Sequence, residues 1–306
     1  MMQNALYAGV NAAVLTPMTA DLAPDLDRMA AHCRWLLSNG CNGLGILGTT
    51  GEANSLGFNE RIATMEGLVA RGIPAAKLMP GTGTPALTDT MLLTRKAAEL
   101  GCRGALLLPP FYYKNPSDDG LFAYFSEVVQ RLGADIRLYL YNFPQQSAVP
   151  FSLDFVGRLL KAFPGVFKGV KDSSGNWDNT RGYVEHFAKD GFEVYAGDDS
   201  LLLANLRAGG AGCITAASNV NCSVGARVYA NWSTNAGEQA QLVLTGTRKA
   251  VISVPLIPGL KSLVARNTGD PGWKTVCPPH VPLAAEQEAK LFAAFDACGV
   301  ELAKAA

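Results

Sequence analysis

Lys171 is the residue of this sequence whose type and position best suit covalent chemistry. It follows the short apolar stretch at residues 167–170, and Ser173, Ser174 and Gly175 turn the chain after it. Burial at the end of a strand disfavours the charged ammonium form, and a neutral lysine amine is a nucleophile that forms a Schiff base with a carbonyl substrate. Most lysines are solvated at the surface. The rest of the chain therefore has to show whether Lys171 is a nucleophile or an ordinary surface residue.

Two further groups could act with such an amine. Thr49 and Thr50 follow the apolar stretch at residues 43–47, and their hydroxyls, with the free N–H groups of a glycine-bounded turn, suit a carboxylate. Tyr141 ends another apolar stretch, and a phenol near an amine can transfer protons. Tyr139 is expected on the same face, because side chains alternate along a strand. The ordinary interpretations are a local turn for the threonines and a core position for the tyrosines.

The elements that position these residues alternate regularly between strands and helices. In about the first 220 residues, eight strand-like stretches recur at intervals of roughly 25 to 30 residues, with helical patterns between most of them. Strands that are buried on both faces have continuous apolar sequences, and this repetition predicts an α/β fold, a parallel (β/α)8 TIM barrel. The strand-like stretches are residues 10–15, 43–47, 78–79, 105–108, 136–141, 167–170, 193–196 and 212–215.

The barrel prediction brings the reactive residues together. In barrels of this type the active site lies at the carboxyl ends of the strands. The lysine and the threonine pair follow predicted strands, as do Tyr113 and Asp199, and the tyrosine is the last residue of one. We therefore expect these side chains to converge on one rim.

The chain after the last predicted strand has a different character. Helical patterns at residues 224–232, 238–252 and 284–303 are joined by the Pro- and Gly-containing residues 255–282. We therefore predict two parts. Residues 1–222 form the barrel that carries the active site, and residues 223–306 form a C-terminal helical extension.

Composition excludes several classes of protein. Hydrophobic residues make up 48% of the 306 and charged residues 17%, with a formal net charge of zero, so neither nucleic acid nor a membrane surface is an expected partner. The seven cysteines have no C-x-x-C spacing, which predicts no metal site, no disulfide framework and a cytoplasmic location. The start of the chain has no basic flank before an apolar run, and no apolar run is long enough to span a membrane.

One motif suggests a different cofactor. The sequence GLGILG at residues 43–48 matches the G-x-G-x-x-G pattern of dinucleotide-binding proteins. That pattern should follow a strand and begin a helix, whereas two of these glycines lie within the predicted strand and a loop follows them. We therefore do not predict a nicotinamide cofactor.

Taken together, these motifs resemble the dihydrodipicolinate synthase/N-acetylneuraminate lyase family. Their order and spacing match over essentially the whole chain, including the helical tail. The resemblance rests on GTTGE at residues 48–52, the tyrosine pair at 112–113, YNFP at 141–144, GVKDSSGN at 169–176 and AGDD at 196–199. It implies a lyase or aldolase that acts on 2-oxo acids by a class I, metal-independent mechanism.

The resemblance also assigns roles to residues. Lys171 matches the family's Schiff-base lysine, which makes a separate cofactor unnecessary, and Tyr141 matches its proton-transferring tyrosine. Thr49 and Thr50 match the pair that binds the carboxylate of pyruvate and links to the tyrosine. Ile214 matches the position on the last strand whose backbone faces the substrate.

The resemblance implies an oligomer as well. Tyr113 matches the tyrosine that, in many members, reaches into the site of a neighbouring subunit and completes a proton relay. The family is commonly a homotetramer built as a dimer of dimers, so this arrangement is expected here.

The substrate tail is where this sequence departs from the family. Dihydrodipicolinate synthases carry an arginine two residues after the proline of YN-x-P, and this chain has Gln146, a neutral amide that cannot replace a bidentate guanidinium. Sialic acid lyases carry an Asp-Glu pair where this chain has Asp199 and Ser200. We therefore predict reversible cleavage of a 2-keto-3-deoxy sugar acid into pyruvate and an aldehyde, with Gln145, Gln146 and Asp199 contacting the tail.

Three alternatives remain open from the sequence. The chain could be a dihydrodipicolinate synthase, a dehydratase of 2-keto-3-deoxy acids, or a non-catalytic protein that binds a 2-oxo acid. The retained lysine, tyrosine and threonine pair argue against the last of these, because a binding protein needs no nucleophilic amine.

Overall fold

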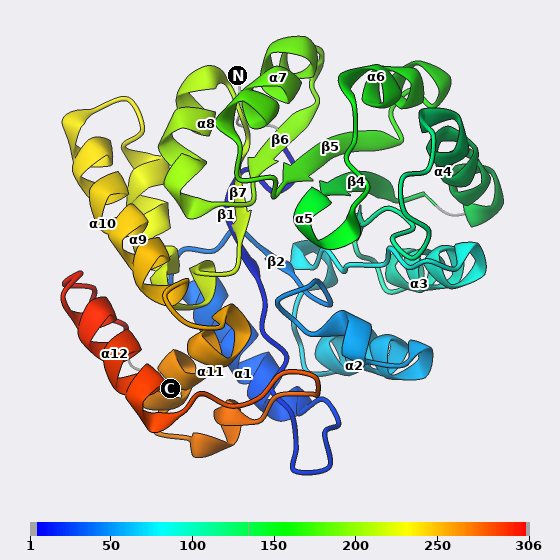
Figure 1. Ribbon diagram of the computed structural model, residues 1–306. Coiled ribbons are helices and arrows are strands. Elements are labelled where there is room, and N and C mark those ends of the chain that lie inside the picture. The colour runs from blue at the N-terminus through cyan, green and yellow to red at the C-terminus, as the bar shows by residue number, and fades with distance from the viewer. Residues whose placement is uncertain (1–4, 134, 304–306) are drawn as a thin grey trace.

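A single parallel sheet forms the centre of the molecule. The computed structural model describes residues 5–133 and 135–303. Seven strands pair in the order β2-β1-β7-β6-β5-β4-β3, and helices surround them (Figure 1). The strands are β1 (Gly9–Ala13), β2 (Gly43–Gly45), β3 (Gly104–Leu107), β4 (Arg137–Asn142), β5 (Phe167–Asp172), β6 (Glu193–Ala196) and β7 (Gly212–Thr215).

The sheet closes into a barrel through the chain between α2 (Phe58–Ala70) and α3 (Leu87–Glu99). Leu78 forms a parallel bridge with Leu44 on β2, and Gly81 forms one with Leu106 on β3. The backbone N–H of Gly81 also donates to the carbonyl of Ile46 at 2.8 Å. This segment therefore takes the place of the eighth strand, and the predicted eightfold barrel is confirmed.

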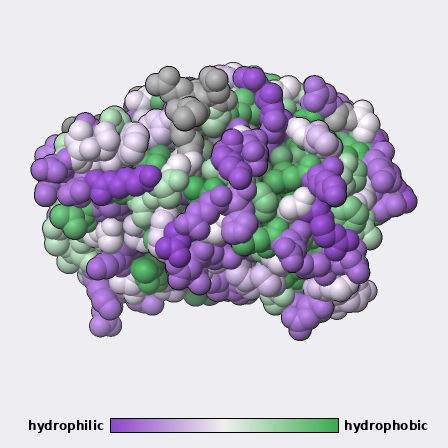
Figure 2. All heavy atoms as spheres, turned by 90° about the horizontal axis from the view of Figure 1, so that it is seen from above, coloured by the Kyte–Doolittle hydropathy of each residue, from purple (hydrophilic) through white to green (hydrophobic). Residues whose placement is uncertain are grey.

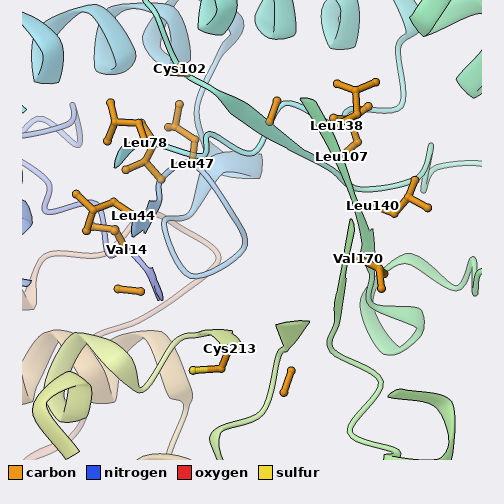
Figure 3. Close-up of a cluster of buried hydrophobic side chains, with 14 of the residues drawn as sticks. Val14, Leu44, Leu47, Leu78, Cys102, Leu107, Leu138, Leu140, Val170 and Cys213 are labelled. Atoms are coloured by element: carbon orange, nitrogen blue, oxygen red, sulfur yellow. The ribbon is translucent and has the colours of Figure 1, made fainter. Parts of the chain in front are cut away.

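Side chains alternate between the inside and the outside of the barrel, as the strand geometry requires. Tyr139, Tyr141 and Ile214 belong to a cluster in the barrel interior. Leu138 and Leu140 on β4 belong instead to the larger cluster between the strands and the helices (Figure 3). The expectation that the two tyrosines share a face is therefore confirmed.

Four helices around the barrel begin where the sequence supplies a capping side chain. Asp25, Ser117, Ser152 and Asn176 each accept a hydrogen bond from a backbone N–H of the first turn of their helix. These helices are α1 (Leu26–Ser38), α4 (Asp118–Leu132), α6 (Leu153–Ala162) and α7 (Trp177–Phe187). The remaining helices of the ring are α8 (Leu202–Ala208) and α9 (Ser218–Ala230), and the four-residue α5 (Pro144–Ser147) lies after β4.

The C-terminal part is helical, with one helix that the sequence did not predict. α10 (Asn235–Val251) and α12 (Ala285–Asp296) correspond to predicted helices. α11 (Leu256–Thr268) lies within residues 255–282, which we expected to be a connecting stretch. The prolines and glycines of this stretch indicated a connection, but Pro258 occupies the first turn of α11, where a backbone N–H would have no partner within the helix. The connection is therefore shorter than predicted.

The predicted division after residue 222 falls inside α9. Val224 and Val228 on this helix belong to the same hydrophobic cluster as Val10 on β1. The helices α10 to α12 contribute to a second cluster, which includes Leu260, Leu291 and Val220 of α9. We propose that the helical extension begins after α9, because the whole of α9 serves as a helix of the barrel.

Figure 2 shows the molecule from above, relative to Figure 1. The surface on this side mixes hydrophilic and hydrophobic residues. Among the described residues, no helix combines the length and the apolar composition that a membrane span requires.

His32 provides a test of the packing between α1 and the C-terminal part. Its ring stacks on Trp35 and contacts Trp273 edge-on, and its Nε2 lies 2.9 Å from Oδ1 of Asn219. Burial lowers the pKa of His32 from 6.5 to about 4. The unfolded chain therefore binds a proton at this histidine between these pH values while the folded chain does not, so stability falls as the pH falls through this window.

We expect this histidine to lower the free energy of unfolding by about 2 kcal/mol between pH 7 and pH 5. Urea denaturation of the wild type and of His32→Gln at both pH values measures the contribution, which the substitution should remove. His186→Gln, at an exposed position, is the matched control and should keep the wild-type pH dependence. An equal pH dependence in wild type and His32→Gln would contradict the assignment.

Candidate active site

A pocket of about 660 Å³ opens at the carboxyl ends of the strands. Lys171, Tyr141, Thr49 and Thr50 all line it, together with Ala216 at the end of β7. The structure thus brings together four residues that the sequence placed after three separate strands.

A second pocket, of about 600 Å³, lies between α1 and α11, beside Trp35 and Trp273. It contains none of the residues that the sequence analysis selected.

Strand register places Lys171 beside Tyr141. In the parallel pairing of β4 with β5, these two residues are direct partners, and Lys171 is also the partner of Tyr195 on β6. The Nζ atom of Lys171 lies 4.2 Å from the centroid of the Tyr141 ring. Only 5% of Lys171 is exposed, so the interpretation of this residue as a solvated surface lysine is wrong.

Asp172, the next residue on β5, faces the helices instead of the barrel interior. Its carboxylate accepts hydrogen bonds from Asn142 Nδ2 at 2.8 Å, from the hydroxyl of Ser174 at 2.9 Å and from the hydroxyl of Thr180 at 2.6 Å. These bonds join β4, β5 and α7 directly behind the lysine. The KDSSGN segment is therefore held rigidly on the side away from the pocket.

Gly197 allows the chain after β6 to approach the lysine segment. A Cβ atom at this position would lie only 2.1 Å from Oγ of Ser173 and 2.8 Å from the carbonyl oxygen of Asp172. The backbone N–H of Gly197 donates to that carbonyl at 2.7 Å. The glycine of AGDD is thus required by a close approach of two strand ends.

The threonine pair lies in the loop that follows β2, beside Tyr141. Oγ1 of Thr49 lies 3.3 Å from the hydroxyl oxygen of Tyr141, so a proton can pass between the two. Thr50 is buried against the pocket. Both threonines therefore line the same pocket as Lys171.

The loop that carries the threonines is anchored to the C-terminal extension by a buried ion pair. Glu52 has a left-handed backbone conformation, with φ 54°, and its carboxylate forms an ion pair with Lys261 of α11. The second carboxylate oxygen accepts from the backbone N–H of Cys277 at 2.7 Å, and the ammonium donates to the carbonyl of Thr275 at 2.8 Å. Both side chains are fully buried, and burial lowers the pKa of Lys261.

The predicted tail contacts divide into two groups. Gln145 and Gln146 on α5 line the pocket, and Nε2 of Gln145 donates to the carbonyl of Ser174 at 2.5 Å. Asp199 does not line it: its side chain is buried and accepts a hydrogen bond from Asn221 at 3.2 Å. Asp198 lines the pocket at this point instead. The structure therefore does not bring Asp199 to the pocket lining, because the chain turns into η4 (Asp199–Leu201) immediately after β6.

Two other predicted residues lie outside the pocket lining. Ile214 is buried in the barrel interior in the same cluster as Tyr141. Tyr113 is 80% exposed, and its ring packs edge-on against Tyr112. Within one chain, Tyr113 therefore contacts neither the lysine nor the threonines.

The pocket lining also includes Asp198, Arg248 and His280, which were not selected from the sequence. Arg248 of α10 and His280 come from the C-terminal extension, and Asp198 follows β6. Asp198 adjoins the predicted Asp199, so the AGDD motif contained a signal for it. Arg248 and His280 have no local motif, because only the packing of the extension over the barrel brings them to the pocket. Within residues 5–133 and 135–303, no group of three or more His, Cys, Asp or Glu side chains is arranged to hold a metal ion.

A (β/α)8 barrel with a pocket at the carboxyl ends of its strands has the architecture of a barrel enzyme. The chain belongs to the dihydrodipicolinate synthetase family, whose model matches residues 6–297. It is accordingly a lyase of that family.

Individual relatives agree with this assignment. A Chloroflexus aurantiacus protein named "Uncharacterized DapA-like lyase" is 35% identical over 291 residues, which cover 94% of this chain and 96% of that protein. The 4-hydroxy-tetrahydrodipicolinate synthase of Listeria monocytogenes serotype 4a is 37% identical over 212 residues, 68% of this chain and 71% of that enzyme.

Solved structures agree as well. Dihydrodipicolinate synthase from Agrobacterium tumefaciens superposes with a TM-score of 0.88 at 35% identity, over 95% of this chain and 99% of that one. YagE from E. coli K12, a prophage protein of the dihydrodipicolinic acid synthase family solved in complex with pyruvate, has a TM-score of 0.88 at 27% identity, over 96% and 99% of the two chains.

The ion pair of Glu52 gives a prediction on stability. Lys261→Met removes the ammonium and leaves a buried carboxylate without its counter-charge, which should lower the free energy of unfolding by about 3 to 5 kcal/mol. Chemical denaturation followed by circular dichroism measures the change. Arg131→Met is the control, because its pair with Glu127 is solvent-exposed and should contribute less than about 1 kcal/mol. Equal effects of the two substitutions would contradict a special role for the buried pair.

Proposed function

We propose that this protein is a class I aldolase that cleaves and forms 2-keto-3-deoxy sugar acids through a Schiff base on Lys171. The observation that carries the proposal is the convergence of Lys171, Tyr141 and Thr49 in one pocket at the barrel rim. The lysine amine lies over the tyrosine ring, and the tyrosine hydroxyl lies within reach of the threonine hydroxyl. A nucleophile, a proton carrier and a polar cradle are the groups that this chemistry requires.

The reaction begins when the amine of Lys171 adds to the C2 carbonyl of the substrate and the carbinolamine loses water to give an iminium ion. In the cleavage direction, Tyr141 accepts the proton of the C4 hydroxyl. The C3–C4 bond breaks, its electron pair moves toward the iminium nitrogen, and an aldehyde leaves. The resulting enamine takes the proton from Tyr141 at C3, and water then releases pyruvate and restores the amine.

Thr49 and Thr50 bind the C1 carboxylate in this scheme. A carboxylate held there keeps C2 near the lysine amine, which replaces a bimolecular encounter by a fixed geometry. The backbone of Ile214, deeper in the barrel, faces the same end of the substrate. The covalent Schiff base supplies the electron sink, so the scheme needs no metal and no further cofactor.

The solved complex of YagE with pyruvate supports pyruvate as the 2-oxo acid product. Gln146 argues against aspartate semialdehyde as the aldehyde partner, because a neutral amide is a weak partner for a second carboxylate at that position. Dehydration is the second candidate reaction, since the same iminium allows loss of the C3 proton and then of the C4 hydroxyl as water. A dihydrodipicolinate synthase and a non-catalytic binding protein are the remaining alternatives.

We also propose a homotetramer built from tight dimers, in which Tyr113 reaches the site of a neighbouring subunit. Tyr112 and Tyr113 together form an exposed aromatic pair, and large exposed aromatic side chains favour an interface. We propose a cytoplasmic location for this assembly, in keeping with seven cysteines that are all free.

Trapping with borohydride tests the Schiff base directly. Incubation of the purified protein with pyruvate and borohydride should add one reduced pyruvyl group to the peptide that contains Lys171, as measured by mass spectrometry. Lys171→Arg should give no adduct, because a guanidinium does not form the imine. Tyr141→Phe should still form the adduct but lower kcat by about 10²-fold or more, because proton transfer is lost. Absence of an adduct from the wild type with several 2-oxo acids would favour a binding protein.

A substrate panel distinguishes the reactions. We expect release of pyruvate from 2-keto-3-deoxy sugar acids, monitored by coupling to lactate dehydrogenase, and slow or no condensation of pyruvate with aspartate semialdehyde. Formation of a 2,5-dioxo or related dehydrated product without pyruvate would assign the dehydratase reaction instead. Robust condensation with aspartate semialdehyde would contradict the proposed substrate class.

A further inference from the structure

Arg248 is a charged residue of the pocket for which the proposed reaction has no role so far. It comes from α10, near the end of that helix, and lines the same pocket as Lys171. Its side chain is only 18% exposed, so the guanidinium has given up most of its hydration. A cation in this environment requires a counter-charge or good hydrogen-bond acceptors.

The protein supplies only a weak partner for this guanidinium. Nε of Arg248 lies 3.5 Å from Oδ2 of Asp198, and within the described residues this buried nitrogen has no hydrogen-bond acceptor. The other oxygen of Asp198 already accepts from the backbone N–H and the hydroxyl of Ser200, at 2.9 and 2.6 Å. The ion pair thus leaves hydrogen-bonding capacity of the planar guanidinium unused, and a bidentate carboxylate is the ligand that best fits it.

Asp199 is the other carboxylate near this arginine. Its side chain is buried, which raises its pKa, and Asn221 donates to one of its oxygens at 3.2 Å. Asp199 is therefore engaged with the interior of the protein and does not take the place of a ligand.

The rest of the pocket indicates where a second anionic group would bind. The carboxylate of Glu52 is neutralised by its ion pair with Lys261. On the wall near the lysine, Gln145, Gln146 and Ser174 supply only amides and hydroxyls. Once Lys171 is bonded to C2 of a substrate, Arg248 is the remaining arginine or lysine of the pocket lining.

We propose that Arg248 binds a carboxylate at the end of the substrate remote from the 2-oxo group, so that the preferred substrates are 2-oxo-3-deoxy diacids. This inference rests on the proposed Schiff-base chemistry of Lys171 and deepens it by naming the substrate class. It changes the expectation drawn from Gln146. The arginine missing from α5 is replaced by one from α10, a different element that approaches the pocket from the C-terminal extension.

A matched pair of substrates tests the inference on the wild-type enzyme. The two compounds are six-carbon 2-oxo-3-deoxy acids of the same stereochemistry, one ending in a carboxylate and the other in a CH₂OH group. We expect kcat/KM for pyruvate formation to be about 10- to 100-fold higher for the diacid, since hydrogen bonds to a charged group contribute about 1.5 to 3 kcal/mol. An equal rate, or a preference for the CH₂OH compound, would overturn the proposal. So would a preference for a 6-phosphorylated analogue over both.

Variants then assign the preference to the residue. Arg248→Met should lower kcat/KM for the diacid about 10- to 100-fold, mainly through KM, and so abolish the preference. Arg248→Lys should retain part of it, because the charge remains while the bidentate geometry is lost. Lys249→Met is the matched control, since it removes a neighbouring charge of α10 that is exposed and does not line the pocket. A diacid preference that persists in Arg248→Met would overturn the proposal.

Borohydride trapping with pyruvate separates the two levels of inference. Pyruvate has no tail, so the adduct reports whether Lys171 and the fold are intact. Failure of the wild type to form the adduct counts against the Schiff-base function, whereas an adduct without a diacid preference counts only against Arg248. If Arg248→Met does not fold, the wild-type substrate pair and the Arg248→Lys variant decide the question.

Discussion

The buried ion pair between Glu52 and Lys261 is the interaction on which the pocket depends most. It joins the loop after β2, which carries the threonine pair, to α11 of the C-terminal extension. Two charges removed from water are tolerated only when they are paired and hydrogen-bonded, and here the backbone at Cys277 and Thr275 completes the pairing. The barrel and the extension are therefore not independent parts, because the position of the threonine loop is set by both.

The chemistry of the pocket follows from the alternation of strand residues. Lys171 points into the barrel and Asp172 points toward the helices, so adjacent residues of β5 have opposite roles. The inward lysine meets Tyr141 through the register of β4 with β5. The outward carboxylate takes hydrogen bonds from β4, from the loop after β5 and from α7. A shift of the register by one residue would exchange these two faces. The hydrogen bonds of Asp172 therefore also keep Lys171 directed into the pocket.

Much of this arrangement could be predicted from the sequence. The repeated apolar stretches predicted the barrel, and the motif residues Lys171, Tyr141, Thr49 and Thr50 do meet in one pocket. Two expectations differ from the structure, each for a local reason. The prolines and glycines of residues 255–282 indicate a connection, whereas Pro258 is compatible with α11 because it lies in the first turn of that helix. Asp199 was expected in the pocket because it belongs to AGDD, but a single turn after β6 directs Asp198 there instead.

The sequence by itself determined the elements and the type of chemistry, because apolar periodicity and the residues at strand ends are local properties of the chain. Only the tertiary structure decided which residues of the C-terminal extension line the pocket. Arg248 and His280 have no local signal, since they lie far along the chain from the strand ends and reach the pocket only when the extension packs over the barrel. The partner of Glu52, 209 positions further along the chain at Lys261, is hidden for the same reason. Contacts between distant segments depend on how the segments pack, and no short motif records that packing.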